Sequence, residues 1–153
     1  MKRMIMTALL LLTVLGGCGA KQPQQVDLQA FFEKTQEKYD LAGMVELEEE
    51  MLDAFYPGLS ALNTVQCVAY APMISASVSE YVFLQCADRD SVQKAEEIFR
   101  QRIAEQAEGG AWYPESMAAW SRAVVVTRDD YVLLIASADD AERIAADFAA
   151  IFP

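Results

Sequence analysis

The sequence contains no histidine at all. Histidine is the side chain that most often works as a general base near neutral pH, and it is the commonest zinc ligand. Only three cysteines are present, which is too few for a four-cysteine zinc site. The motifs of serine nucleophiles and of calcium-binding loops are also missing. The sequence therefore predicts no cofactor, no metal and no catalytic site, although its many carboxylates leave open a small enzyme that uses an acidic pair.

Basic residues are scarce in this chain. Lysine and arginine number 12 against 23 aspartates and glutamates. Lys2 and Arg3 lie in the first 17 residues, so their removal would leave ten basic side chains and a charge of −13. A surface of this charge repels nucleic acid and anionic lipid headgroups. We therefore expect no nucleic-acid partner and no attachment to a membrane through a basic patch.

The chain also lacks an apolar run long enough to span a bilayer. The longest, residues 4–15, follows Lys2 and Arg3 and contains 12 residues, whereas a transmembrane helix needs about 20. Positive charge, a short apolar run and then small residues are the order of a secretory signal peptide. Leu15-Gly16-Gly17-Cys18 completes this order and resembles the lipobox of bacterial lipoproteins.

The lipobox resemblance implies that Cys18 is fatty-acylated and becomes the mature N-terminus. More than one acyl chain holds a protein firmly on a bilayer, so we expect attachment to the extracytoplasmic face of the cell membrane. The chain then divides into a signal peptide (1–17), a lipidated cysteine with a polar tether (18–26) and one domain (27–153). The alternative is an ordinary signal peptide that ends by chance at a cysteine.

Hydrophobic periodicity predicts an α+β domain. Helical spacing and strand alternation occur in the following ranges: helices over 27–39, 46–55, 89–107 and 139–152, and strands over 64–70, 78–86, 122–127 and 130–137. This order favours an antiparallel sheet of about four strands with helices on one face. Residues 79–99 and 128–148 are similar to each other, which suggests a doubled β-β-α unit; chance similarity is the alternative.

Three segments carry a second resemblance. They are "SEYVFLQCADRDSVQKAEEIFRQRIAEQ", "WYPESMAAW" and "AVVVTRDDYVLLIASAD", and they lie within about residues 45–150. Together they resemble a domain-of-unknown-function family found in small Gram-positive lipoproteins. The resemblance implies an α+β fold. It implies no activity, so no functional residue is carried over from the family.

The two remaining cysteines, Cys67 and Cys86, lie on the apolar faces of two predicted strands. A hairpin centred between Ala76 and Ser77 would place them opposite each other, at a spacing that suits a disulfide. An extracytoplasmic compartment permits oxidation. The alternative is a pair of buried free thiols that act as small hydrophobic side chains.

Three aromatic side chains, Trp112, Tyr113 and Trp120, gather in the connector between two predicted elements. They are weak candidates for a ligand-binding lip, and the alternative is that they cover one end of the core. We interpret the protein as a binding module near the membrane that serves an envelope protein or a small ligand. A carboxylate-based envelope enzyme and an accessory structural lipoprotein are the rival interpretations.

Overall fold

The structure is a computed structural model that describes residues 25–72 and 79–153. The predicted signal peptide, Cys18 and the centre of the predicted hairpin at Ala76 and Ser77 lie outside the described residues. Within the described part of the chain, no helix combines the length and apolarity needed to cross a bilayer.

Five antiparallel strands form one sheet, in the order β1-β2-β3-β5-β4. The strands are β1 (Met44–Glu46), β2 (Thr64–Pro72), β3 (Glu80–Cys86), β4 (Val124–Arg128) and β5 (Tyr131–Ala136). The predicted α+β class and antiparallel sheet are confirmed, with one strand more than the four expected. The additional strand is β1, whose three residues are too few to show an alternating pattern.

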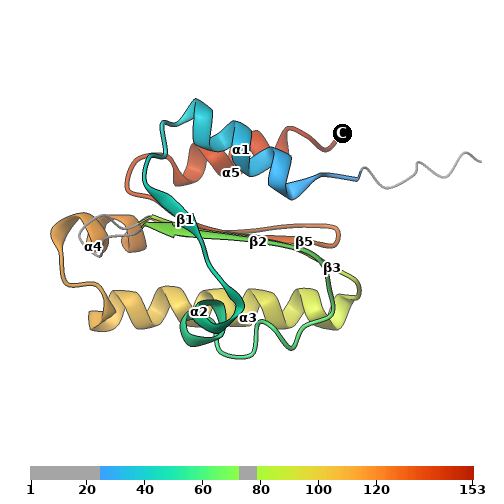
Figure 1. Ribbon diagram of the computed structural model, residues 1–153, viewed down its shortest axis with the longest axis horizontal. Coiled ribbons are helices and arrows are strands. Elements are labelled where there is room, and N and C mark those ends of the chain that lie inside the picture. The colour runs from blue at the N-terminus through green and yellow to red at the C-terminus, as the bar shows by residue number, and fades with distance from the viewer. Residues whose placement is uncertain (1–24, 73–78) are drawn as a thin grey trace, which may run out of the picture.

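Helices cover both faces of the sheet, as Figure 1 shows. On one face lie α1 (Leu28–Lys38) and α5 (Ala141–Ala149), and on the other lie α2 (Glu49–Phe55) and α3 (Arg89–Glu105). The helix α4 (Pro114–Ser121) lies beside the end of the sheet, with Trp120 in the core of the α2 and α3 face. The prediction of helices on one face is therefore wrong. The reason lies in the two central strands, β3 and β5, in which every residue is buried. A strand that is apolar on both sides requires cover on both sides.

The predicted doubling of the β-β-α unit holds for the strands and fails for the helices. Val82 pairs with Leu134 on one face, and Phe83 pairs with Leu133 at the centre of the β3–β5 register. Two residues separate β3 from α3, whereas four separate β5 from α5. The two following helices then lie on opposite faces of the sheet.

Aromatic rings fill the face beneath α1 and α5. Phe32 stacks on Tyr70 with ring centroids 4.0 Å apart, and Phe148 meets Phe31 edge-on at 5.3 Å. Such pairs contribute about 0.5–1.5 kcal/mol beyond the burial of their area. They leave Phe32 and Phe148 almost fully buried.

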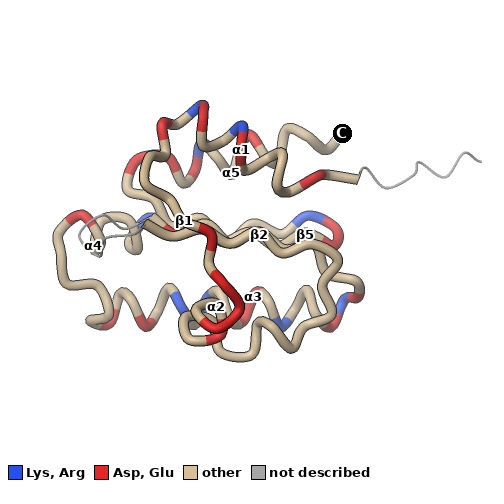
Figure 2. The backbone as a smooth tube through the Cα atoms, in the orientation of Figure 1, with Lys and Arg blue, Asp and Glu red and all other residues tan. Residues whose placement is uncertain are grey.

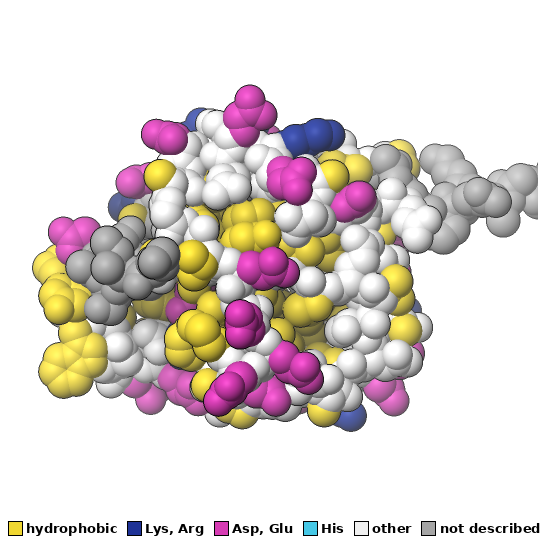
Figure 3. Space-filling model, viewed as in Figure 1, with side chains coloured by type: hydrophobic (Ala, Val, Ile, Leu, Met, Phe, Trp, Pro, Cys, Tyr) yellow, Lys and Arg dark blue, Asp and Glu magenta, His cyan; other side chains and the backbone are white. Residues whose placement is uncertain are grey.

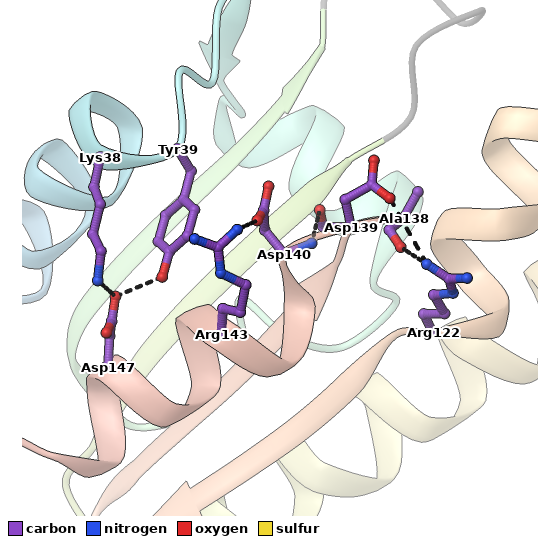
Figure 4. A network of polar contacts seen from close by, with 9 residues as sticks. Lys38, Tyr39, Arg122, Ala138, Asp139, Asp140, Arg143 and Asp147 are labelled. Atoms are coloured by element: carbon purple, nitrogen blue, oxygen red, sulfur yellow. Dashed lines mark hydrogen bonds and ion pairs between the residues drawn. The ribbon is translucent and has the colours of Figure 1, made fainter.

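Polar contacts join the outer surfaces of these two helices, as Figure 4 shows. Asp147 on α5 accepts hydrogen bonds from Lys38 Nζ at 2.5 Å and from Tyr39 Oη at 2.7 Å. Arg143 on α5 contacts Asp140, the residue that precedes the helix. These pairs are exposed, so each contributes only about 0.2–1 kcal/mol. The two bonds to Asp147 connect the end of α1 to α5, beside a smaller hollow of about 490 Å³ that Phe31, Lys34 and Ile151 help to line.

Candidate binding cleft

A cleft of about 600 Å³ opens at one end of the other face, between α2 and the connector that joins α3 to α4. This volume lies in the usual range of ligand pockets, about 300–1,000 Å³. Its lining is mainly apolar and comes from β1, α2, the end of β2 and the connector: Val45, Leu47, Phe55, Ala71, Trp112 and Tyr113.

Local sequence explains how the connector forms a wall of the cleft. The last turn of α3 continues into a short π-helical turn, η1 (Gln106–Gly110), which ends where Gly109 has a φ of 127°. A side chain at this φ would be strained, which explains why a glycine occupies the end of the helix. Pro114 then starts α4 at a position where its missing N–H costs nothing. Residues 111–113 between them are extended and line the cleft.

A buried ion pair lies at the base of the cleft. Glu80, at the start of β3, accepts a hydrogen bond from Arg102 Nη2 at 2.7 Å and one from Tyr56 Oη at 2.5 Å. Only 8% of the Glu80 side chain and 12% of the Arg102 side chain are exposed. Burial, followed by the neighbouring Glu80 carboxylate, raises the pKa of Tyr56 well above its usual value. Tyr56 therefore stays protonated and donates to the carboxylate.

Aromatic rings surround the guanidinium of this pair. Arg102 lies 5.0 Å from the ring centroid of Phe55 and 5.3 Å from that of Trp120. Burial alone would lower the pKa of Arg102, but the hydrogen bond and charge of Glu80 outweigh it and the pKa is raised. The group is a fixed cation that ties α3 to β3, α2 and α4.

One polar side chain in the cleft wall has no internal partner. Ser116 on α4 is 2% exposed, and its hydroxyl finds no hydrogen bond among the described residues. A buried hydroxyl without a partner costs about 1–3 kcal/mol. The oxygen itself is buried in the cleft wall, so a group that enters the cleft reaches it after a local shift of that wall.

The structure separates the three predicted aromatic residues. Trp112 and Tyr113 line the cleft and are 84% and 50% exposed, whereas Trp120 is buried in the core and does not line it. Sequence reasoning missed Glu80, Arg102 and Ser116. These residues lie far apart in the chain and have no shared spacing, and only the packing of α3 and α4 on the sheet brings them together.

The register of β2 and β3 differs from the predicted hairpin. Cys67 lies opposite Leu84, and Cys86 lies opposite Thr64, beside a bulge between Thr64 and Gln66. The predicted direct opposition of the cysteines is therefore wrong, because the pairing is offset by two residues. Both thiols are free in the structure. Cys67 is exposed and Cys86 is buried, so the alternative of two buried thiols fits Cys86 alone. Burial and the carboxylates of Asp88 and Asp130 raise the pKa of Cys86 to about 11, so it is not a reactive thiolate at neutral pH. A disulfide between them stays a prediction.

Comparison with known proteins identifies a family. The model of a domain of unknown function, DUF4358, matches residues 37–137, which is more than half of the chain. The chain belongs to the DUF4358 family. No curated protein and no solved structure matches it. The DUF4358 match spans all five strands and the helices α2, α3 and α4, so it contains the whole lining of the cleft, whereas α5 lies beyond it.

Proposed function

We propose that this DUF4358 protein is an extracytoplasmic lipoprotein, anchored through Cys18, that binds a partner or ligand in the cleft. The supporting observation is the cleft itself, which is concave, mainly apolar and bordered by exposed aromatic side chains. The Leu15-Gly16-Gly17-Cys18 sequence supports the anchor. Exposed aromatic side chains at the edge of a pocket are typical of binding surfaces.

The entry of the chain into the domain supports this arrangement. The Val26 N–H donates to Tyr131 Oη at 2.8 Å, and the Gln66 amide donates to the Val26 carbonyl at 2.9 Å. These contacts fix the first described residues at the end of the sheet opposite α4 and the connector (Figure 1). A tether from Cys18 would reach only about 20 Å. The domain would then stay close to the bilayer with its cleft directed away from it.

Binding is better supported than catalysis by the chemistry of the cleft. A hydrolase that uses two carboxylates needs both in one site. Among the described residues that line the cleft, Glu80 is the one acid, and it is held by Arg102 and Tyr56. The proposal therefore assigns Glu80 a structural role at the base of the cleft.

Site-specific photo-crosslinking in the native membrane tests the binding proposal. A photoreactive residue in place of Trp112 lies at the cleft, and one in place of Val65 is a matched control, because Val65 is also an exposed hydrophobic residue but lies away from the cleft. We expect a specific adduct from position 112 and none from position 65. The purified partner should then bind the wild type and not Ala111→Phe, which fills the cleft. Equal adducts from both positions, or binding unaffected by the filled cleft, would contradict the proposal.

The anchor has its own test. Cys18→Ser removes the sulfur that would carry the lipid, so the variant should leave the membrane fraction or remain unprocessed. Membrane fractionation and intact mass measure this directly. A variant that is cleaved after Gly17 and still partitions into detergent like the wild type would refute the lipid anchor.

A further inference from the structure

Carboxylates lie along the α2 wall of the cleft, where Glu48, Glu49 and Glu50 fall between the lining residues Leu47 and Met51, and the Arg102 guanidinium at the base is buried against Glu80. The chain has no lysine or arginine from residue 39 to 88, nor from residue 103 to 121. These two stretches supply every residue of the cleft lining. Figure 2 shows the acidic residues along the end of β1 and into α2, and Figure 3 shows their carboxylates beside hydrophobic side chains. We name the exposed carboxylates of Glu48, Glu49 and Glu50 the acidic rim.

The cleft wall also contains a buried polar group that has no hydrogen-bond partner among the described residues. This group is the hydroxyl of Ser116, a residue that is 2% exposed. A hydroxyl in this place can accept from or donate to a backbone group of a bound chain. This feature is independent of the acidic rim, because it concerns burial and not charge.

The hydrophobic side chains near the opening are of an adaptable kind. Met51 on α2 and Met117 on α4 are 44% and 57% exposed, and Trp112 is 84% exposed. Methionine has a flexible and polarizable side chain that adjusts to different apolar partners. The open face of a tryptophan ring also attracts a lysine or arginine cation. The cleft therefore combines apolar contact, negative charge and a ring that favours cations.

We propose that the occupant of the cleft is a basic amphipathic peptide segment of a partner protein, whose apolar side chains enter the cleft while its lysines and arginines meet the acidic rim. Acidic, methionine-containing apolar grooves suit amphipathic helices with positive charge. The volume of about 600 Å³ admits a few large apolar side chains. This inference rests on the proposed binding function and specifies the chemistry of its partner.

The test uses the full chain in phosphatidylcholine nanodiscs, with empty nanodiscs as the blank. Three peptides carry leucines at the same i, i+3, i+4 and i+7 positions and have only lysine, only glutamine or only glutamate elsewhere. Affinity is measured at low and at high salt. The rim variant replaces Glu48, Glu49 and Glu50 with glutamine. A matched control replaces Glu33, Glu37 and Glu142 with glutamine, which makes the same charge change on the α1 and α5 face.

The lysine peptide should bind at least about tenfold more tightly than the glutamine peptide, because exposed ion pairs together contribute about this factor. The rim variant should lose about tenfold in affinity, while the control should change less than about twofold. High salt should weaken binding to the wild type.

Three results would overturn the inference. Equal loss in the rim variant and in its control would show general charge attraction without a site. If all three peptides bind with equal affinity and Ala111→Phe abolishes their binding, the partner need not be basic. The proposal that the cleft is a binding site would still hold. If no peptide binds, the basic segment is refuted, while the crosslinking at position 112 decides the binding function separately.

The Ser116→Ala variant distinguishes a binding role of the hydroxyl from a structural role, because the two roles predict different effects on stability and on peptide affinity. Removal of an unpaired buried hydroxyl should leave the thermal midpoint unchanged or raise it. Binding of the lysine peptide should nevertheless weaken about fivefold, since the variant cannot bond the peptide backbone. Unchanged affinity would refute the assigned contact of Ser116, and a lowered midpoint would show that the hydroxyl is already satisfied in the free protein.

Discussion

The two faces of the sheet are covered in different ways. Beneath α1 and α5 the contacts are ring against ring, and Phe32 and Phe148 are at most 1% exposed. Beneath α2 and α3 a buried ion pair lies among the aromatic rings, and a cleft opens beside it. The α1 and α5 face combines this packing with exposed polar contacts at its outer surface, beside a smaller hollow of about 490 Å³. The other combines packing with charge and retains accessible apolar surface, which is the property that a binding site needs.

The largest expected contrast is in the cost of removing an aromatic ring from each face. Phe32→Ala on the α1 and α5 face should lower the free energy of unfolding by about 3–5 kcal/mol, because it leaves a cavity in a tight core. Phe55→Ala on the cleft wall should cost about 1–2 kcal/mol, since this ring is half-buried and contributes mainly its contact with Arg102. Urea unfolding measures both values. Equal costs would remove the distinction between the faces.

Removing one partner of the Glu80–Arg102 ion pair should lower the free energy of unfolding more than replacing both partners with apolar residues. Arg102→Met leaves the Glu80 carboxylate buried without its partner, so it should cost about 3 kcal/mol or more. Replacing both residues with Met and Leu should recover a large part of that loss. If the double variant is as unstable as the single one, the two residues stabilise the fold through contacts other than their own ion pair.

Stability should fall in alkaline solution if the two cysteines are free. The folded chain holds the thiol proton of the buried Cys86 up to a pKa of about 11, whereas the unfolded chain releases it near 9.0. Because the unfolded state then binds fewer protons, the free energy of unfolding decreases as pH rises from 9 to 11. Cys86 alone should account for about 2–3 kcal/mol. Urea unfolding of wild type and Cys86→Ala checks this, and an identical pH dependence of the two would indicate a disulfide.

The smallest effect on stability is expected at the opening of the cleft. Trp112→Ala removes a side chain that is 84% exposed, so the free energy of unfolding should change by less than about 0.5 kcal/mol. Binding at the cleft should weaken in the same variant, because large aromatic side chains dominate binding surfaces. Calorimetry with the lysine peptide separates the two effects. A marked loss of stability would assign Trp112 to the core.

Part of the cleft was visible in the sequence. Glycine at 109 and proline at 114 end one helix and start the next, and the aromatic pair Trp112-Tyr113 lies between them. No sequence pattern indicated the residues at the base of the cleft. Glu80 and Arg102 are single charged residues in a strand and a helix, and their pairing depends on how α3 crosses the sheet.

The sequence by itself determined the α+β class, the apolar strands β3 and β5, and the order of the elements other than β1 and α4, because local periodicity and turn residues act over a few positions. Tertiary structure decided which face each helix covers. The linker before α5 is two residues longer than the one before α3, and α5 lies on the other side of the sheet. Tertiary structure also decided the β2–β3 register, because a bulge and the pairing across the sheet offset Cys67 from Cys86. The cleft forms because these long-range contacts place the connector between α3 and α4 beside α2.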